Sequence, residues 1–227
     1  MRASYFRGRK MPYGLCLFDL DGTLTDPKPG ILKSFQYALS ALGVEGEAAD
    51  PSLLIGPPLR EAIRGLYGLS EPETERAVAK YREYYSEAGL FENDVYPGIR
   101  ELLRALADSK VTLAVATSKA SVYTNRILSR FGLDGFFSFV SGDELDGSLT
   151  KNGKRDIIRA ALDALDPGRE MRAVMIGDRR HDITGAREMG IDSIGVLWGY
   201  GSRDELEAAG ATRIAASMEE LPGMILS

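Results

Sequence analysis

The feature that most constrains the fold is a regular alternation of short apolar runs with longer amphipathic segments. The apolar runs occupy residues 15–18, 111–116, 173–176 and 193–197, with a weaker run at 213–216. Segments with helical periodicity fill the later intervals, at residues 121–131, 154–165 and 181–189. Connections this short require right-handed crossovers between parallel strands. We therefore predict an α/β fold: a Rossmann-like, mostly parallel sheet with helices on both faces.

One long interval breaks the alternation. Between the first and second apolar runs we find no convincing strand, and the pattern predicts helices at residues 31–42, 59–67, 73–88 and 99–107. Proline and glycine turns at 27–29 and 97–98 mark the edges of the interval. We expect residues 13–26 and 95–227 to form an α/β core catalytic domain, and residues 27–94 an inserted helical cap domain. A plain layer of helices packed on the sheet is the alternative.

The beginning of the chain and the overall charge bear on location and partners. Residues 1–12 carry several basic side chains but no apolar run, so we expect a disordered extension that is neither a secretory signal nor a membrane anchor. The net charge of −5 gives no reason to expect a nucleic-acid partner. No later stretch approaches the ~20 apolar residues of a membrane span. We therefore expect a cytoplasmic protein with no nucleic-acid or membrane partner.

Polar side chains follow three of the predicted strands, at the point where each strand ends. The residues concerned are Asp19 and Asp21 after the first run, Thr117, Ser118 and Lys119 after the second, and Asp178 and Asp182 after a later one. Ligands of open parallel sheets bind beyond the carboxyl ends of the strands, so we expect these side chains to converge there. A lone aspartate at such a place is usually a helix cap or turn former. Capping alone does not explain several of them at one edge.

The clustered carboxylates predict a phosphoryl-transfer site that binds Mg²⁺. Carboxylates repel one another unless a cation intervenes, and their oxygens suit Mg²⁺, which commonly bridges to phosphate. A carboxylate such as Asp19 can attack phosphorus and form an aspartyl phosphate. Asp21 lies two residues away, on the same side of an extended chain, and can act as general acid and base. That role requires its pKa to be raised above the ordinary value of ~3.9.

Spacing excludes several competing chemistries. The residue six after Cys16, the only cysteine, is Gly22, so the Cys–Arg pair of a cysteine phosphatase is missing. The glycines near Lys154 are spaced one residue too far apart for a nucleotide-binding P-loop, and Gly199-Tyr200-Gly201 lacks the third glycine of a dinucleotide fingerprint. The only histidine, His181, is expected to face solvent on the first turn of a helix.

The chain resembles hydrolases of the haloacid dehalogenase superfamily. "FDLDGTLT" matches the D-x-D-G-T signature of that superfamily, "LAVAT" ends in its threonine, a lysine precedes a later helix, and "IGDRRHD" carries the final aspartates. The resemblance implies that Asp19 is the nucleophile and Asp21 the general acid and base. It also implies that Mg²⁺ is held by the Asp19 side chain, the Asp21 carbonyl and Asp178, with Asp182 supporting the site.

The same resemblance implies that Thr117 and a lysine bind the phosphoryl oxygens. We also predict that Gly22, Thr23 and Ser118 bind phosphate, and that Lys119, beside Thr117, is a further cation that contacts the substrate or phosphate. "SLTKNGKRDII" offers Lys151 and Lys154, and it departs from the usual lysine-proline form. We favour Lys154 because it lies nearer the start of the helical pattern.

The segments "IGPPLREA" and "YPGIRELL" resemble the phosphoglycolate phosphatase and 5′-nucleotidase branch of the superfamily. In that branch the first segment lies on the cap facing the site, where Arg60 could meet a polar substrate tail; otherwise Arg60 is a solvated helix residue. The expected activity is hydrolysis of a small phosphomonoester, with phosphoglycolate and nucleoside 5′-monophosphates both left open. A sugar-phosphate mutase and a non-enzymatic binding or regulatory protein are the alternatives. The oligomeric state stays open.

Overall fold

The structure is a computed structural model that describes residues 12–44, 50–149 and 153–227. The predicted extension at residues 1–12, apart from its last residue, and Lys151 therefore lie outside the described residues. No helix in the described part is long and apolar enough to cross a membrane.

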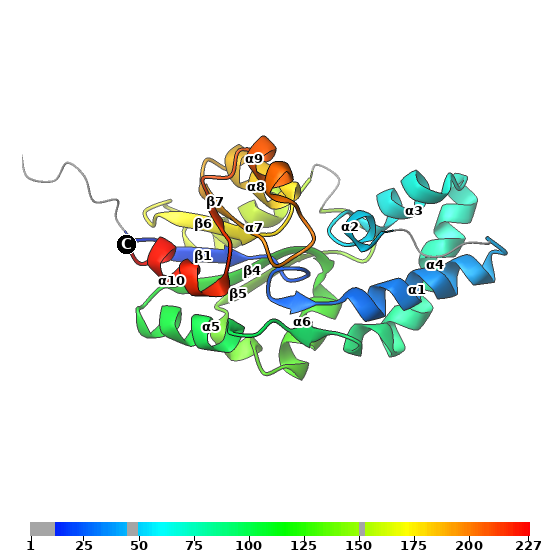
Figure 1. Ribbon diagram of the computed structural model, residues 1–227, viewed down its shortest axis with the longest axis horizontal. Coiled ribbons are helices and arrows are strands. Elements are labelled where there is room, and N and C mark those ends of the chain that lie inside the picture. Colours follow the sequence, from blue (N-terminus) through cyan, green and yellow to red (C-terminus); the bar gives the residue numbers. More distant parts are fainter. Residues whose placement is uncertain (1–11, 45–49, 150–152) are drawn as a thin grey trace, which may run out of the picture.

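A six-stranded parallel sheet forms the centre of the molecule (Figure 1). Its strands are β1 (Leu15–Phe18), β4 (Thr112–Ala120), β5 (Phe139–Asp143), β6 (Ala173–Gly177), β7 (Asp192–Val196) and β8 (Arg213–Ala215). Their order in the sheet is β5-β4-β1-β6-β7-β8, and every neighbouring pair is parallel. The chain builds outward from β1 on one side and then crosses to the other, so the strand order reverses at β1. A crevice at such a reversal is where α/β sheets bind ligands.

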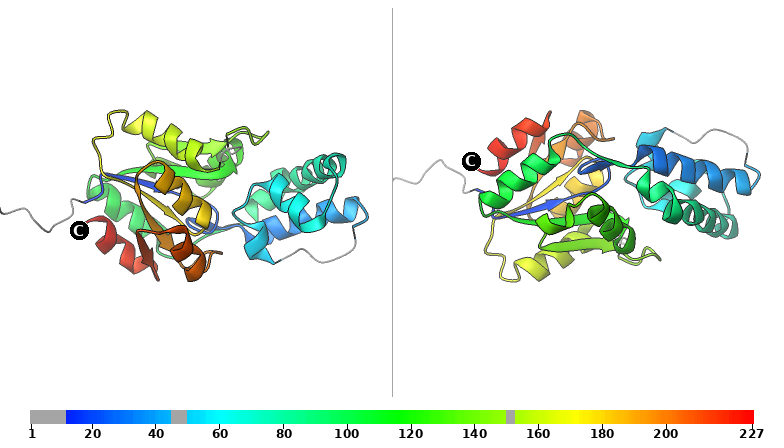
Figure 2. Two further views of the ribbon diagram at one scale, coloured as in Figure 1. Left: turned by 90° about the horizontal axis from the view of Figure 1, so that it is seen from above. Right: turned by 90° about the horizontal axis from the view of Figure 1, so that it is seen from below.

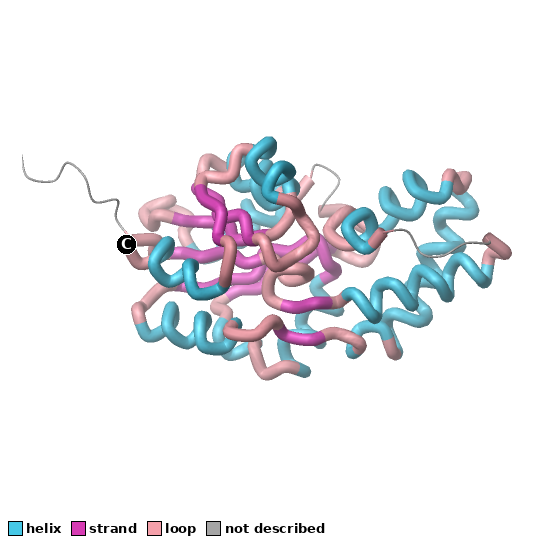
Figure 3. The backbone as a smooth tube through the Cα atoms, viewed as in Figure 1, coloured by secondary structure: helices cyan, strands magenta, loops and turns pink. Residues whose placement is uncertain are grey.

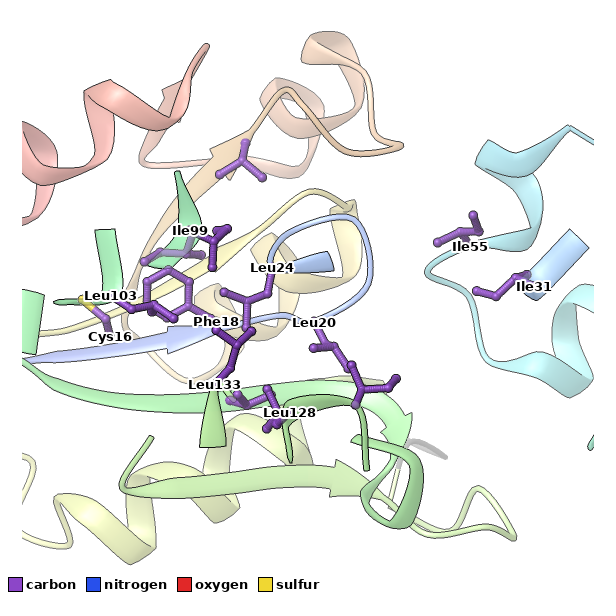
Figure 4. Packing of buried hydrophobic residues seen from close by; sticks show 14 of the residues in the cluster. Cys16, Phe18, Leu20, Leu24, Ile31, Ile55, Ile99, Leu103, Leu128 and Leu133 are labelled. Atoms are coloured by element: carbon purple, nitrogen blue, oxygen red, sulfur yellow. The ribbon is translucent and has the colours of Figure 1, made fainter. Parts of the chain in front are cut away.

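Alternating side chains of the strands bury both faces of this sheet. Cys16 and Phe18 of β1 belong to a core that includes α5 (Ile99–Asp108), α6 (Ser121–Arg130) and α10 (Leu221–Ile225). Leu15 and Leu17 pack on the opposite face, against α7 (Arg155–Leu165) and α8 (Arg180–Glu188). Figure 4 shows part of the first cluster around Phe18. A further helix, α9 (Arg203–Ala209), packs against α8. The predicted α/β class with helices on both faces is confirmed.

The remaining helices lie together beyond the carboxyl ends of the strands. They are α1 (Lys28–Ala41), α2 (Pro51–Leu54), α3 (Leu59–Tyr67), α4 (Glu71–Glu87) and the short 3-10 helix η1 (Gly89–Phe91). Both views of Figure 2 show them beside the sheet rather than layered on it. The longest two, α1 and α4, pack through Phe35 and Tyr81, whose ring centroids are 5.0 Å apart. We refer to residues 27–94 as the cap; these boundaries remain our proposal.

Three strands were not expected from the sequence. The prediction that residues between the first two apolar runs form no strand is wrong: β2 (Thr25–Asp26) pairs antiparallel with β3 (Asp94–Val95), as Figure 3 shows. Strands of two residues are too short to show an alternating pattern. β5 was also missed, because only its first two residues, Phe139 and Val140, are apolar. The ribbon formed by β2 and β3 carries both chain passages between the core and the cap.

Candidate active site

Asp19 and Asp21 stand in a tight loop directly after β1. Asp19 is buried, and its backbone N–H donates to the carbonyl of Ile176 on the neighbouring strand β6. Gly22 has a positive φ of 83°, and a Cβ there would lie 2.3 Å from the Asp178 carboxylate. Only glycine therefore lets this loop approach the loop after β6 so closely. The signature sequence thus brings two acidic loops into contact.

Asp19, Asp178 and Asp182 form a buried acidic cluster at the ends of β1 and β6. One carboxylate oxygen from each lies within 4.8 Å of the others. Burial, together with the neighbouring carboxylates, raises the pKa of Asp178 well above its usual range. The pKa of Asp182 is raised to about 6 by burial, against the opposing effect of Lys154. The cluster fits a Mg²⁺ site, because it holds three hard oxygen donors close together and their carboxylates are costly to ionise without a cation.

The loop geometry holds this cluster in place. Thr23 Oγ1 donates to Asp178 Oδ1 over 3.3 Å, and the N–H of Tyr200 donates to Asp178 Oδ2 over 2.8 Å. The N–H of Arg179 donates to Asp182 Oδ2 over 3.0 Å. Thr23 therefore contacts an acidic side chain, and Gly22 lies close beside the same carboxylate. That Gly22 and Thr23 bind phosphate stays a prediction.

Lys154 reaches the acidic cluster from the start of α7. Its Nζ lies 2.8 Å from Asp19 Oδ1 and also pairs with Asp182 Oδ1. Burial acts to lower the pKa of Lys154, but Asp182 and Asp19 outweigh it and the pKa is raised. A permanently charged lysine beside Asp19 is suited to hold a phosphoryl oxygen. The other candidate, Lys151, lies outside the described residues.

Asp21 is paired with Lys119, which follows the threonine and serine of β4. Lys119 Nζ is 2.7 Å from Asp21 Oδ2 and donates to the Tyr85 hydroxyl of the cap over 2.5 Å. Burial raises the pKa of Asp21, and Lys119 opposes that shift. The upward direction is the one that a general acid requires. Lys119 N also donates to Thr117 Oγ1, so Lys119 and Thr117 lie in one compact group.

A cavity of about 360 Å³ opens in front of Asp19 and Asp21, between the core and the cap. Thr117, Ser118 and Lys119 line it from the core. Arg60 lines it from α3 of the cap, so the structure brings the residue to the site. There its guanidinium pairs with Glu75 (2.6 Å) and donates to the Asp146 carbonyl of the core over 3.1 Å.

Four aromatic residues among those described line the cavity, which sequence reasoning missed; we call them its aromatic wall. Phe35, Tyr81 and Tyr85 of the cap and Tyr123 of α6 all line it. Tyr81 and Tyr85 stack with ring centroids 5.4 Å apart, and Tyr123 meets Tyr85 edge-on at 5.3 Å. Spacing of four residues places Tyr81 and Tyr85 on one face of α4, a signal visible in the sequence. The sequence did not indicate what that face looks onto.

His181 does not face solvent as expected. It is half-buried, and its Nε2 is buried without a hydrogen-bond partner among the described residues. Burial lowers the pKa of His181 to about 4, so the ring is neutral near pH 7. The prediction failed because the first turn of α8 is only partly exposed: Arg180 faces solvent, whereas Asp182, next to His181, is buried.

Comparisons with known proteins agree with this geometry. Residues 16–196 match the haloacid dehalogenase-like hydrolase family. A 5′-nucleotidase of Pseudomonas aeruginosa is 44% identical, over 95% of this chain and 96% of its own length. The tyrosine-protein kinase PtkA of Mycobacterium tuberculosis is 43% identical, over 91% of this chain and 70% of its own. The crystal structure of a predicted phosphatase from Clostridium acetobutylicum is 42% identical, with a TM-score of 0.86, and covers 95% of this chain and 99% of that one.

The fold and the site thus define a parallel α/β hydrolase with an acidic active site. The chain belongs to the haloacid dehalogenase-like hydrolase family. Phosphoglycolate phosphatases are among its more distant relatives. The family and these relatives support its assignment as a phosphoric monoester hydrolase.

Proposed function

We propose that the protein is a Mg²⁺-dependent phosphatase that works through a phosphorylated Asp19. The observation that supports this best is the buried cluster of Asp19, Asp178 and Asp182, whose ligand oxygens lie within 4.8 Å of one another beside an open cavity. Asp19 lines that cavity, whereas Asp178 and Asp182 are not among the described residues that line it. A substrate entering the cavity therefore meets Asp19 first.

The chain's own residues account for both halves of the reaction. A carboxylate oxygen of Asp19 attacks phosphorus, and the bond from phosphorus to the leaving-group oxygen breaks as Asp21 gives that oxygen its proton. Water then attacks the phosphorylated Asp19 and passes a proton to Asp21, which restores both side chains and releases phosphate. Asp21 Oδ1 is buried and has no hydrogen-bond partner in the described part of the chain, so it is available for these transfers.

Positive groups and hydroxyls surround the position of the transferring phosphoryl group. Lys154 contacts Asp19 directly, and Thr117 and Ser118 line the cavity beside it. Mg²⁺ bound by Asp19, Asp178, Asp182 and the Asp21 carbonyl would neutralise the carboxylates and the arriving phosphate. Such compensation is most of what phosphoryl transfer needs.

The cavity favours a nucleoside 5′-monophosphate over phosphoglycolate. Tyr123 of α6 is the most exposed of the aromatic residues that line it, and stacking a base on an aromatic ring is worth about 1–3 kcal/mol. Phosphoglycolate has no ring to stack, and its carboxylate would meet Asp143 and Glu144 on the core wall. Of the cations among the described lining residues, Arg60 pairs with Glu75, Lys119 pairs with Asp21, and Arg82 donates to the carbonyl of Leu145. The 5′-nucleotidase relative is consistent with this choice.

Phosphate release with Mg²⁺ over a panel of phosphoesters tests the proposal. The panel holds nucleoside 5′-monophosphates, phosphoglycolate, sugar phosphates and pyrophosphate, with Asp19→Asn as the blank. We expect release from nucleotides first, no release by Asp19→Asn, and silencing by a chelator that Mg²⁺ reverses. Turnover by a folded Asp19→Asn protein contradicts the covalent route. Isomerised sugar phosphate without release of phosphate indicates a mutase instead. A cytoplasmic location remains part of the proposal.

A further inference from the structure

The segment 198–201, with the sequence WGYG, follows β7 and has no role in the chemistry above. It lies against both acidic loops. Trp198 Nε1 donates to the carbonyl of Thr23 over 3.1 Å. A Cβ on Gly201 would lie 1.9 Å from the carbonyl oxygen of Asp178, so only glycine permits this contact. The glycines of Gly199-Tyr200-Gly201, which do not complete a dinucleotide fingerprint, are thus explained by their close packing on the acidic loops.

Tyr200 makes the first of two links through its backbone. Its N–H donates to Asp178 Oδ2 over 2.8 Å, and Thr23 holds the other oxygen, Oδ1. The orientation of the Asp178 carboxylate is therefore set by the positions of these two residues. A shift of the Tyr200 backbone would turn or release that carboxylate.

The Tyr200 side chain makes the second link, at the ribbon that carries the cap. Its hydroxyl donates to Asp26 Oδ1 of β2 and lies beside the side chain of Tyr96, the residue after β3. The Tyr96 N–H in turn donates to the carbonyl of Leu24 over 3.1 Å. One hydroxyl thus contacts both chain passages between core and cap.

We infer that Tyr200 is a positioning residue that couples the orientation of the cap to the acidic cluster. Asp26 is the last core residue before the cap and lies in the β2–β3 ribbon, so a turn of the cap about this ribbon displaces Asp26. Tyr200 bonds to Asp26 through its hydroxyl and to Asp178 through its N–H, so closure of the cap and the correct orientation of Asp178 favour each other. Tyr200 is not among the described residues that line the cavity, so it acts through Asp178. The inference rests on the proposed function, in which Asp178 is a metal ligand.

Tyr200→Phe tests the coupling because it removes the hydroxyl and keeps the N–H that holds Asp178. The readout is amide hydrogen exchange of peptides covering residues 20–28 and 93–97, with and without Mg²⁺. In the native protein we expect Mg²⁺ to slow this exchange about fivefold or more. In Tyr200→Phe we expect Mg²⁺ to bind, as measured by calorimetry, without slowing it.

Tyr13→Phe is the matched control. The Tyr13 hydroxyl donates to Asp192 over 2.8 Å, the same kind of tyrosine–aspartate bond, on β7 at the opposite end of the sheet. This variant should keep the full effect of Mg²⁺ on the ribbon. Asp26→Asn weakens the other partner and should reproduce Tyr200→Phe, which also provides a test should Tyr200→Phe fold poorly.

Kinetics add a second readout. We expect kcat to fall about five- to tenfold in Tyr200→Phe, with a smaller change in KM. The combined variant with Asp26→Asn should lose little more, because both changes remove one interaction.

Mg²⁺ protection of the ribbon that is equal in Tyr200→Phe and the native protein overturns the coupling. So does a native ribbon that does not respond to bound Mg²⁺. Both results leave phosphate release intact and so do not affect the proposed function. Absence of Mg²⁺ binding and of phosphate release overturns both.

Discussion

Lys154 shows how a single residue can hold an active site together. Its ammonium group is buried between Asp19 and Asp182, in a position where each carboxylate alone would be costly to ionise. Removing one member of a buried charged group leaves the others uncompensated. An exposed pair such as Lys33 and Glu92 has water to replace either partner.

Lys154→Met should therefore destabilise the protein far more than Lys33→Met. We expect a loss of about 3 kcal/mol in the free energy of unfolding for the buried lysine, and little change for the exposed one because water replaces its partner. Urea unfolding at neutral pH without Mg²⁺ measures both. Equal losses in the two variants would show that Lys154 is not compensating the acidic cluster.

At the scale of elements, helices α4 and α6 supply three of the four aromatic residues in the wall of the cavity, and α1 supplies Phe35. α4 begins with a capping box made by Ser70 and Glu73, which fixes its first turn. Tyr81 and Tyr85 are four residues apart in the same helix and therefore lie on one face of it. Tyr123 stands on the first turn of α6 and meets Tyr85 from the core side. The wall therefore combines helices from both sides of the cavity: α4 and Phe35 of α1 from the cap, and α6 from the core.

Tyr123→Ala should reduce the activity toward nucleotides selectively. If its ring contacts the base, kcat/KM for a nucleoside 5′-monophosphate should fall about tenfold, since stacking is worth about 1–3 kcal/mol. For phosphoglycolate, which offers nothing to stack, we expect a change of about twofold or less. Steady-state kinetics with both substrates checks this. A parallel fall for both would place the role of Tyr123 in the chemistry rather than in recognition.

At the scale of the whole molecule, the acidic cluster joins two loops of the sheet and should make stability depend on metal and on pH. The folded-state pKa of Asp182 is raised to about 6, so the folded protein holds a proton that the unfolded chain has lost. The stability linked to this group is therefore full below about pH 4 and is lost as pH rises to about 6. A cation that replaces the proton restores it.

Mg²⁺ should accordingly raise the melting temperature more at about pH 7.5 than at about pH 5, where protons compete for the carboxylates. With Mg²⁺ at 100 times its dissociation constant, the gain is about 2.7 kcal/mol, or a rise of about 5–10 °C. Thermal melts with and without Mg²⁺ at each pH measure this rise. His181 also contributes to the pH dependence of stability, but its contribution is the same with and without Mg²⁺ and cancels in the difference. Asp182→Asn should lose most of the rise, and the exposed Asp134→Asn should keep it. The same rise at both pH values would argue against binding at this cluster.

The sequence by itself determined the parallel sheet and the residues at its carboxyl edge. Both follow from local rules: apolar runs bury strands on both faces, and the residues after each strand meet at one edge. Asp19, Asp178 and Asp182 could be brought together on that basis, although they are up to 163 residues apart. The missed strands β2, β3 and β5 were too short or too polar to carry a pattern.

Only the tertiary structure decided what surrounds those carboxylates. Four features depend on contacts between segments distant in the chain. They are the pairing of Lys119 with Tyr85, the aromatic wall, the burial of His181 and the two links of Tyr200. The periodicity of the sequence does not predict such contacts, because they depend on how the cap docks on the core and not on the hydrophobic pattern within the cap or within the core. The sequence thus determined which reactive side chains stand at the carboxyl edge of the sheet. Tertiary packing decided the shape of the cavity in front of them and how the cap is linked to the acidic cluster.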